Sequence, residues 1–266
     1  MTFLARLVTA LAIATDDARP DAVHAVVLTE SDYGDCLDEL ADLLGEDPAR
    51  ASVIAALLAA AAEERGLTGA SAQAKYLEAQ GLVGVGDLPG ALRLIDAAER
   101  GFRAADRSGA ALRTNLGRSH VLNEMGRHED ALAAADAIVT TLARRSPADL
   151  DPTERAVLLA YAQQNRGLCC ELSSRYADAL DAYAAAESVY RRLGDHALIG
   201  EVANDRGLVL MAIGRIGEAL GAFRFAESGP IFNVNTPALS FEARTGSTWL
   251  DAQSKLKSRS VTSAIL

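Results

Sequence analysis

Aromatic side chains are scarce in this sequence of 266 residues: Phe, Tyr and Trp together make up 5%, and there is a single Trp. Hydrophobic residues nevertheless reach 50%, and much of that share comes from runs of Ala. Small apolar side chains suit close packing of helices, whereas strands are enriched in aromatic and β-branched residues. The composition therefore favours a soluble, mostly helical protein over a β-sandwich.

Cysteine is also scarce, because the chain has only Cys36 and the adjacent pair Cys169 and Cys170. These three cysteines do not build a disulfide framework or a closed zinc site, and neighbours on a helix point in different directions. The chain also lacks the His-x3-His and His-Glu-x-x-His spacings of metal sites. We therefore predict no metal, no cofactor, and a reducing, cytoplasmic location.

Positive charge is in deficit, with 26 Lys and Arg against 36 Asp and Glu and a net charge of −10. Because nucleic-acid affinity comes mainly from clustered Lys and Arg, we expect neither nucleic acid nor an anionic membrane as a partner. Long apolar runs are missing too: the Ala-rich stretch 51–61 is followed by Glu63, short of the roughly 20 residues of a membrane span. The first 14 residues fit an amphipathic helix, with a weak secretory signal peptide as the alternative.

Internal repetition is what the sequence has in abundance. The segments 86–92, 126–132, 174–180 and 214–220 each begin with Gly or Ser and end in Ala-Leu. A regular spacing of about 40 residues between such segments is typical of stacked repeats. The middle interval is eight residues longer than the other two, and its extra residues fall at 144–152, where we predict a longer loop. The repeated alanines are Ala91, Ala131, Ala179 and Ala219, spaced 40, 48 and 40 residues apart.

The sequence pattern of each of the four units predicts a helix, a short turn and a second helix. Apolar residues recur four and seven residues after the alanine, which is the spacing by which a helix buries one face. Twelve residues before the alanine stands a small residue that would let the two helices approach closely. These small residues are Ala79, Ser119, Gly167 and Gly207.

The order of small residue, glycine turn, alanine and aromatic resembles the tetratricopeptide repeat, in the class with longer repeats of about 40 residues. The resemblance covers residues 67–228 and implies an all-α fold, an α-α superhelix (solenoid) of stacked antiparallel helical hairpins. The sequence departs from the pattern because the first helices carry no Trp, the closing proline is missing, and one interval is longer.

The flanks of the four hairpins are predicted separately. Residues 1–66 are expected to form an N-terminal helical cap, in which Asp47-Pro48 opens a helix that fits a degenerate repeat. Residues 229–254 fit a linker and a C-terminal capping helix with Trp249, and the basic, Ser/Thr-rich segment 255–266 fits a mobile tail.

The resemblance also implies a partner-binding groove along the first helices of the hairpins. Amide, aromatic and mixed-charge side chains there suit an extended peptide or a partner helix, and the alternative is that they are merely solvated helix faces. The lysine and asparagine set that clamps a terminal carboxylate in some members is not matched. The groove residues are Gln73, Tyr76, Gln80, Arg113, His120, Asn123, Tyr161, Gln164, Leu168, Glu171, Glu201, Asn204, Leu208 and Met211.

An arginine precedes the small residue in three units, at Arg118, Arg166 and Arg206. We favour an ion-pair ladder for these side chains, because a buried guanidinium needs a partner. The suggested partners are Asp205, Glu171 and Glu218. The alternative is that the three guanidinium groups bind a carboxylate or phosphate ligand.

Signatures of catalysis are weak. The glycines between Gly81 and Gly86 end a helix rather than follow a strand, and no Lys-Ser or Lys-Thr comes after them, so we predict a turn and not a phosphate loop. We predict that the chain is not an enzyme. A weaker alternative is an unrecognised site among His120, Glu171 and Cys169.

The function that these observations favour is a protein–protein interaction scaffold that binds a peptide or helix of a partner protein. The competing hypothesis is a regulatory sensor module that binds a small ligand or signal peptide and controls an effector. Homo-oligomerisation is compatible with either.

Overall fold

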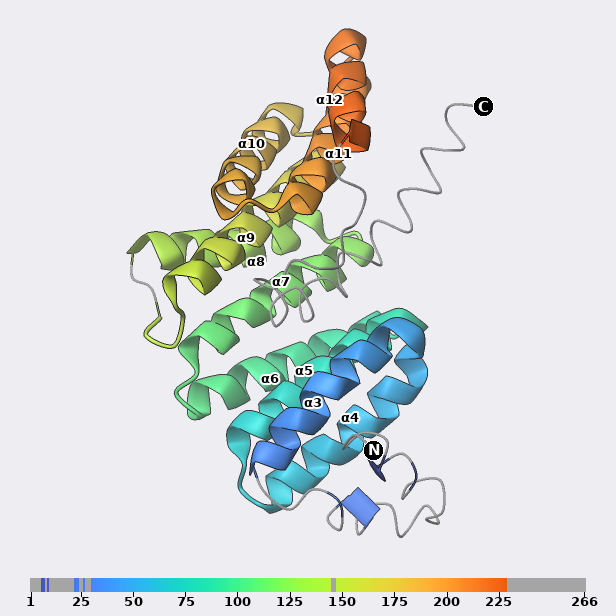
Figure 1. The fold of residues 1–266 in the computed structure, drawn as a ribbon, viewed down its shortest axis with the longest axis vertical. Helices are drawn as coiled ribbons and strands as arrows, with labels where there is room; N and C mark the ends of the chain where they lie inside the picture. The colour runs from blue at the N-terminus through green and yellow to red at the C-terminus, as the bar shows by residue number, and fades with distance from the viewer. Residues whose placement is uncertain are drawn as a thin grey trace. The chain divides into compact units, whose positions relative to one another are not determined.

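The computed structural model of the protein describes residues 30–144 and 147–228, together with 6–7, 9, 22–23 and 26. Every element of regular structure in this part of the chain is an α-helix (Figure 1). The predicted linker and capping helix at 229–254, the predicted tail at 255–266 and most of the first 14 residues lie outside the described residues. The helices are α3 (Glu30–Glu46), α4 (Pro48–Glu64), α5 (Thr68–Val85), α6 (Leu88–Ala104), α7 (Ser108–Glu124), α8 (His128–Arg144), α9 (Pro152–Leu172), α10 (Tyr176–Leu193), α11 (His196–Ala212) and α12 (Ile216–Ser228).

Consecutive helices pack against one another within two compact units that divide between Thr114 and Asn115, inside α7. In the first unit α3 packs on α4 and α5, and α5 packs on both α4 and α6. In the second unit α8, α9, α10 and α11 each pack on the next helix along the chain. Because short turns join most consecutive helices, helices that follow one another along the chain run antiparallel. The predicted fold class, an all-α solenoid of stacked helical hairpins, is confirmed. None of the described helices is both long enough and apolar enough to cross a membrane.

The repeated alanines and small residues mark the places where the two helices of a hairpin meet. Ala91, Ala131, Ala179 and Ala219 are all buried. A Cβ atom at Gly167 would lie 2.5 Å from the Tyr183 ring, and one at Gly207 would lie 2.4 Å from the Phe223 ring. The close packing predicted at the small residue is therefore present, because the missing side chain makes room for an aromatic ring.

The turns between the helices share one backbone conformation. Gly86, Gly126 and Gly214 have φ values of 89°, 72° and 77°, in the left-handed region that glycine adopts easily. The third unit has serine at this place, and Ser174 adopts the same conformation with φ 58°. The turn is therefore imposed by the hairpin and not by glycine alone.

The glycines between Gly81 and Gly86 serve helix packing. A Cβ atom at Gly81 would lie 2.7 Å from the Pro48 carbonyl oxygen, and one at Gly84 would lie 2.5 Å from the Pro48 Cβ atom. Gly86 then ends α5 in the left-handed conformation. These residues let the start of α4 approach the end of α5, so the predicted turn is confirmed in place of a phosphate loop.

The longer repeat interval is taken up between α8 and α9. Helix α8 ends at Arg144 and α9 begins at Pro152, as the spacing of the alanines predicts. Asp151 accepts hydrogen bonds from the backbone N–H groups of Thr153 (2.7 Å) and Glu154 (2.8 Å), and the Glu154 carboxylate accepts one from the Asp151 N–H (2.9 Å). This capping box stabilises the start of α9.

Candidate functional site

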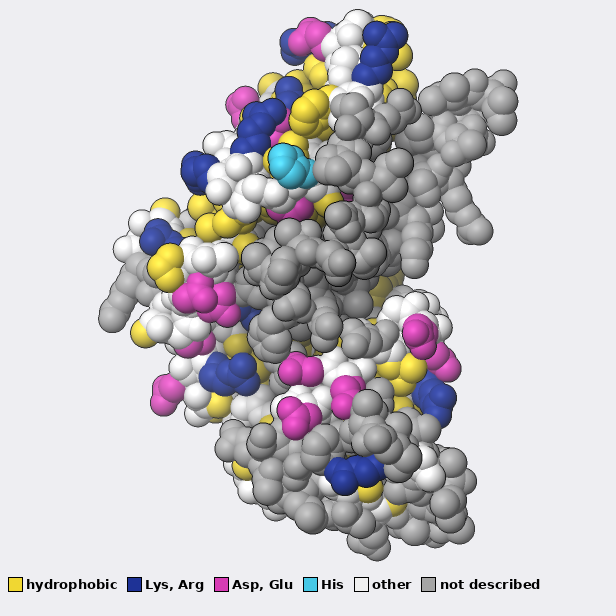
Figure 2. Space-filling view, in the orientation of Figure 1, with side chains coloured by type: hydrophobic (Ala, Val, Ile, Leu, Met, Phe, Trp, Pro, Cys, Tyr) yellow, Lys and Arg dark blue, Asp and Glu magenta, His cyan; other side chains and the backbone are white. Residues whose placement is uncertain are grey.

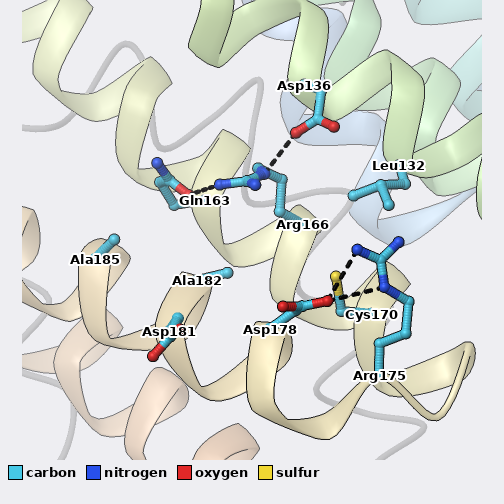
Figure 3. A pocket seen from close by; sticks show the side chains of 10 residues that line it. All are labelled: Leu132, Asp136, Gln163, Arg166, Cys170, Arg175, Asp178, Asp181, Ala182 and Ala185. Carbon is cyan, nitrogen blue, oxygen red and sulfur yellow. Dashed lines mark hydrogen bonds and ion pairs between the residues drawn. The ribbon is translucent and has the colours of Figure 1, made fainter.

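A cleft of about 260 Å³ lies among α8, α9 and α10 in the second unit (Figure 3). Helix α8 forms one wall and α9 the other, and the remaining side chains come from Arg175 and from α10, which follows it. We call it the α8–α9–α10 cleft. It is lined by Leu132, Asp136, Gln163, Arg166, Cys170, Arg175, Asp178, Asp181, Ala182 and Ala185.

Arg166 ties the two walls of the cleft together. Its Nε atom lies 2.6 Å from Oδ1 of Asp136 on α8, and its Nη1 atom donates a hydrogen bond of 2.8 Å to Oε1 of Gln163 on α9. Figure 3 shows the guanidinium reaching from α9 toward Asp136. Two nitrogen atoms of the guanidinium are thereby engaged, which holds the side chain in position without a ligand.

Arg175, directly before the N-terminus of α10, is also held by acidic side chains. Its Nε atom donates a hydrogen bond of 2.9 Å to Oδ2 of Asp178, and Glu129 lies 4.0 Å from its Nη1 atom. The hydrogen bond to Asp178 is the main cause that raises the pKa of Arg175 above its usual value. Asp178 also lies in the first turn of α10, where a negative charge is favoured by the helix dipole.

The sulfur in the cleft is not activated for chemistry. Cys170 is 2% exposed, and burial raises the pKa of its thiol, while the nearby Arg175 lowers it only in part. A thiol with a raised pKa stays protonated at neutral pH, whereas a cysteine nucleophile reacts as the thiolate. Cys170 therefore serves as a small apolar side chain between the helices.

The residues predicted for the first-helix groove occupy three kinds of position, and none of them lines the α8–α9–α10 cleft. Met211 is exposed, whereas Gln73, Arg113, Glu171, Glu201, Asn204 and Leu208 are half-buried. The remaining ones are buried, at Tyr76, Gln80, His120, Asn123, Tyr161, Gln164 and Leu168.

Gln164 illustrates what the buried groove candidates do. Its Oε1 atom accepts a hydrogen bond of 3.1 Å from the Tyr190 hydroxyl on α10, and its Nε2 atom lies 3.4 Å from Oδ2 of Asp205 on α11. The Tyr161 ring packs edge-on against the Tyr190 ring with a centroid distance of 5.9 Å. These amide and aromatic groups join α9 to its neighbours.

The three residues of the weaker enzyme hypothesis have contacts that fit structural roles. The Cys169 sulfur accepts a hydrogen bond of 3.2 Å from Nδ2 of Asn123, and burial raises the pKa of its thiol. Glu171 accepts a hydrogen bond of 2.8 Å from the Tyr183 hydroxyl. Burial lowers the pKa of His120 to about 4, so this imidazole is neutral at physiological pH.

The predicted arginines have partners, on a neighbouring helix for Arg166 and Arg206 and on the same helix for Arg118. Arg206 lies 2.6 Å from the Glu187 carboxylate on α10, and Arg191 pairs with the same carboxylate. Arg118 donates a hydrogen bond of 2.7 Å to Oδ1 of Asn115. The acids that pair with Arg166 and Arg206 are thus Asp136 and Glu187, whereas the sequence suggested Asp205, Glu171 and Glu218. In the described part of the chain, no group of three or more His, Cys, Asp or Glu side chains could hold a metal ion.

Sequence reasoning missed most of the cleft, although one signal for it lies in the repeated segments. Three of them contain Arg-x-x-Asp or Arg-x-x-Glu after the first residue. The structure pairs the two charges each time: Arg127 with Asp130, Arg175 with Asp178, and Arg215 with Glu218. This recurrence identifies Arg175 and Asp178 as an ion pair at the start of a second helix. Asp136, Gln163 and Asp181 carry no comparable signal.

Comparison with known proteins concerns the fold. No protein-family model matches the chain, and no curated protein matches it. Among solved structures, the chain is similar to BtubC (BKLC) from P. vanneervenii, with a TM-score of 0.61 and 16% sequence identity. The match covers 85% of this chain and 90% of that chain. At this identity the likeness shows a shared all-helical fold alone.

Proposed function

We propose that the chain is a protein–protein interaction scaffold of the tetratricopeptide-repeat class, which receives a short segment of a partner protein in the α8–α9–α10 cleft. The observation that carries the proposal is that the polar groups of the cleft are already oriented by one another. Arg166 is held by Asp136 and Gln163, and Arg175 is held by Asp178. A site whose side chains are ordered before binding loses less conformational entropy when a ligand arrives.

The size and chemistry of the cleft favour a peptide segment over a small molecule. Its volume of about 260 Å³ is below the range of about 300–1,000 Å³ that is usual for small-molecule and cofactor sites. The side chains include two guanidinium groups, three carboxylates and one amide, which suit the backbone and polar side chains of a peptide. The protonated thiol of Cys170 favours binding over catalysis.

The regulatory sensor hypothesis would gain support from arginines that present their guanidinium groups to a ligand without acidic partners. Arg166 and Arg206 are instead engaged by Asp136 and Glu187. Repeat hairpins commonly supply extended surfaces for other proteins, and we propose a cytoplasmic location for this scaffold, which the low cysteine content supports.

A peptide selection tests this proposal. A random peptide library displayed on phage would be selected on the immobilised full chain, and the enriched peptides would be synthesised and titrated by fluorescence polarisation. Ala185→Gln places a longer, neutral side chain in the cleft, and we expect it to weaken the selected peptides about tenfold or more. The matched control is Ala184→Gln, which makes the same change at an exposed neighbouring position of α10 that does not line the cleft.

The outcomes separate the site from the function. Failure to enrich any peptide over a control protein contradicts the scaffold function. Peptides that bind Ala185→Gln as tightly as the control Ala184→Gln contradict the cleft as the binding site. If such peptides are instead weakened by Asn204→Asp, binding belongs to the predicted first-helix groove. Thermal unfolding followed by circular dichroism checks that each variant is folded.

A further inference from the structure

The charges of the α8–α9–α10 cleft do not cancel. Asp136 compensates Arg166, and Asp178 compensates Arg175 (Figure 3). Asp181 is the third carboxylate of the lining; it is exposed, and no ion pair or hydrogen bond within the described residues engages it. One negative charge of the cleft is therefore left without a partner.

Further negative charge lies beside the cleft. Glu129 at the start of α8 is 75% exposed and lies 4.0 Å from Arg175, so two carboxylates share that guanidinium. The positive end of the α10 dipole already has Asp178 in its first turn. Figure 2 shows Asp and Glu side chains interspersed with Lys and Arg over the visible face, and the whole chain carries a net charge of −10. A field of this sign attracts cationic partners and accelerates their association.

The shape beside Asp181 fits a long cationic side chain. Ala185 lies one helical turn after Asp181 on α10, so the two side chains are on the same face of the helix. Ala182 and Ala185 both line the cleft, and because Ala182 is only 4% exposed, the half-buried Ala185 supplies most of the accessible apolar surface there. Lysine and arginine combine an aliphatic stem, which packs on apolar surface, with a charged head that seeks a carboxylate.

We infer that the partner segment bound in the cleft carries a lysine or arginine, whose stem lies on Ala185 and whose charged head pairs with Asp181. This inference rests on the proposed function and adds the chemistry of the partner to it.

The test uses the peptides selected on the full chain. We expect a Lys or Arg at one shared position, and we expect acetylation of that lysine to weaken binding about threefold to fivefold, as for a partly exposed ion pair. In Asp181→Asn the acetylated and unmodified peptides should bind equally. Ala184→Lys is the matched control, because it changes the net charge by the same amount on the same helix outside the cleft, and it should keep the preference for unmodified lysine.

The result that overturns the inference is distinct from failure of the proposed function. Peptides that Ala185→Gln blocks, but that lack a basic residue or are enriched in Asp or Glu, retain the scaffold function and refute the basic partner. An unchanged preference for lysine in Asp181→Asn refutes the role of Asp181. If Ala185→Gln weakens no peptide, the cleft is not the binding site and the inference falls with it, whereas the scaffold function itself is contradicted only if no peptide is enriched.

Discussion

The third and fourth hairpins have the same sequence pattern but different burial. Tyr183 and Ala186 on α10 have no exposed surface, whereas the equivalent Phe223 and Ala226 on α12 are half-buried. Helix α11 packs on α10, while α12 is the last helix among the described residues. In a repeat protein the burial of an apolar stripe therefore depends on the hairpin that follows as well as on the stripe itself.

The largest expected difference between the two hairpins concerns their aromatic residues. Tyr183→Ala should lower the free energy of unfolding by about 3–5 kcal/mol, because a fully buried ring is lost and a cavity remains. Phe223→Ala should cost about half as much, since Phe223 keeps part of its surface in solvent. Urea unfolding monitored by circular dichroism measures both changes, and equal losses would contradict the comparison.

A companion variant tests whether Gly167 is small because of Tyr183. Gly167→Ala should destabilise the natural protein, since its new Cβ atom meets the ring. In the Tyr183→Ala background the clash is gone, so Gly167→Ala should stabilise the helix by up to about 1 kcal/mol. Additive effects of the two substitutions would show that the contact does not matter.

The ion pairs of the two hairpins should differ by a smaller amount. Glu187 is 3% exposed and pairs with Arg191 and Arg206, whose side chains are 59% and 35% exposed. Glu187→Gln should cost about 1–2 kcal/mol, reduced from the value for a fully buried pair because water screens both arginines. Glu218→Gln on α12, where the pair with Arg215 is exposed, should leave the urea midpoint unchanged. A larger loss from Glu218→Gln than from Glu187→Gln would contradict this ranking.

The smallest effect is expected at the turns. Ser174 has φ 58° where the fourth hairpin has Gly214 with φ 77°. Ser174→Gly should raise the free energy of unfolding by about 0.5–1 kcal/mol, because glycine relieves the cost of a left-handed conformation and loses part of that gain in the unfolded chain. Ser173→Gly is the control. Ser173 has φ −89°, which any residue adopts, so glycine there only adds freedom to the unfolded chain and the variant should be less stable. Differential scanning calorimetry can resolve the two shifts.

Part of the candidate site could be predicted from the sequence. Arg166 stands out because arginine recurs at its position in three units, and Arg175 and Asp178 belong to a recurring pair. Asp136 and Asp181 could not be selected among the many acidic residues of the chain, because they reach the cleft only through the packing of α8 and α10 against α9. The first-helix groove remains a prediction, and Gln164 shows why it is difficult to judge: a polar side chain on a first helix can face solvent or can bond to the next hairpin.

The sequence by itself determined the helices, their turns and their pairing into hairpins, because these depend on contacts between residues close along the chain. The anchoring alanines, the small residue before each turn and the capping box at Asp151 all act within one hairpin. The tertiary structure alone decided which polar side chains are buried and which charges from different hairpins meet in the cleft, as Arg166 and Asp136 do. These depend on contacts between hairpins, where a shift of one helix exchanges one partner for another without changing the repeat pattern.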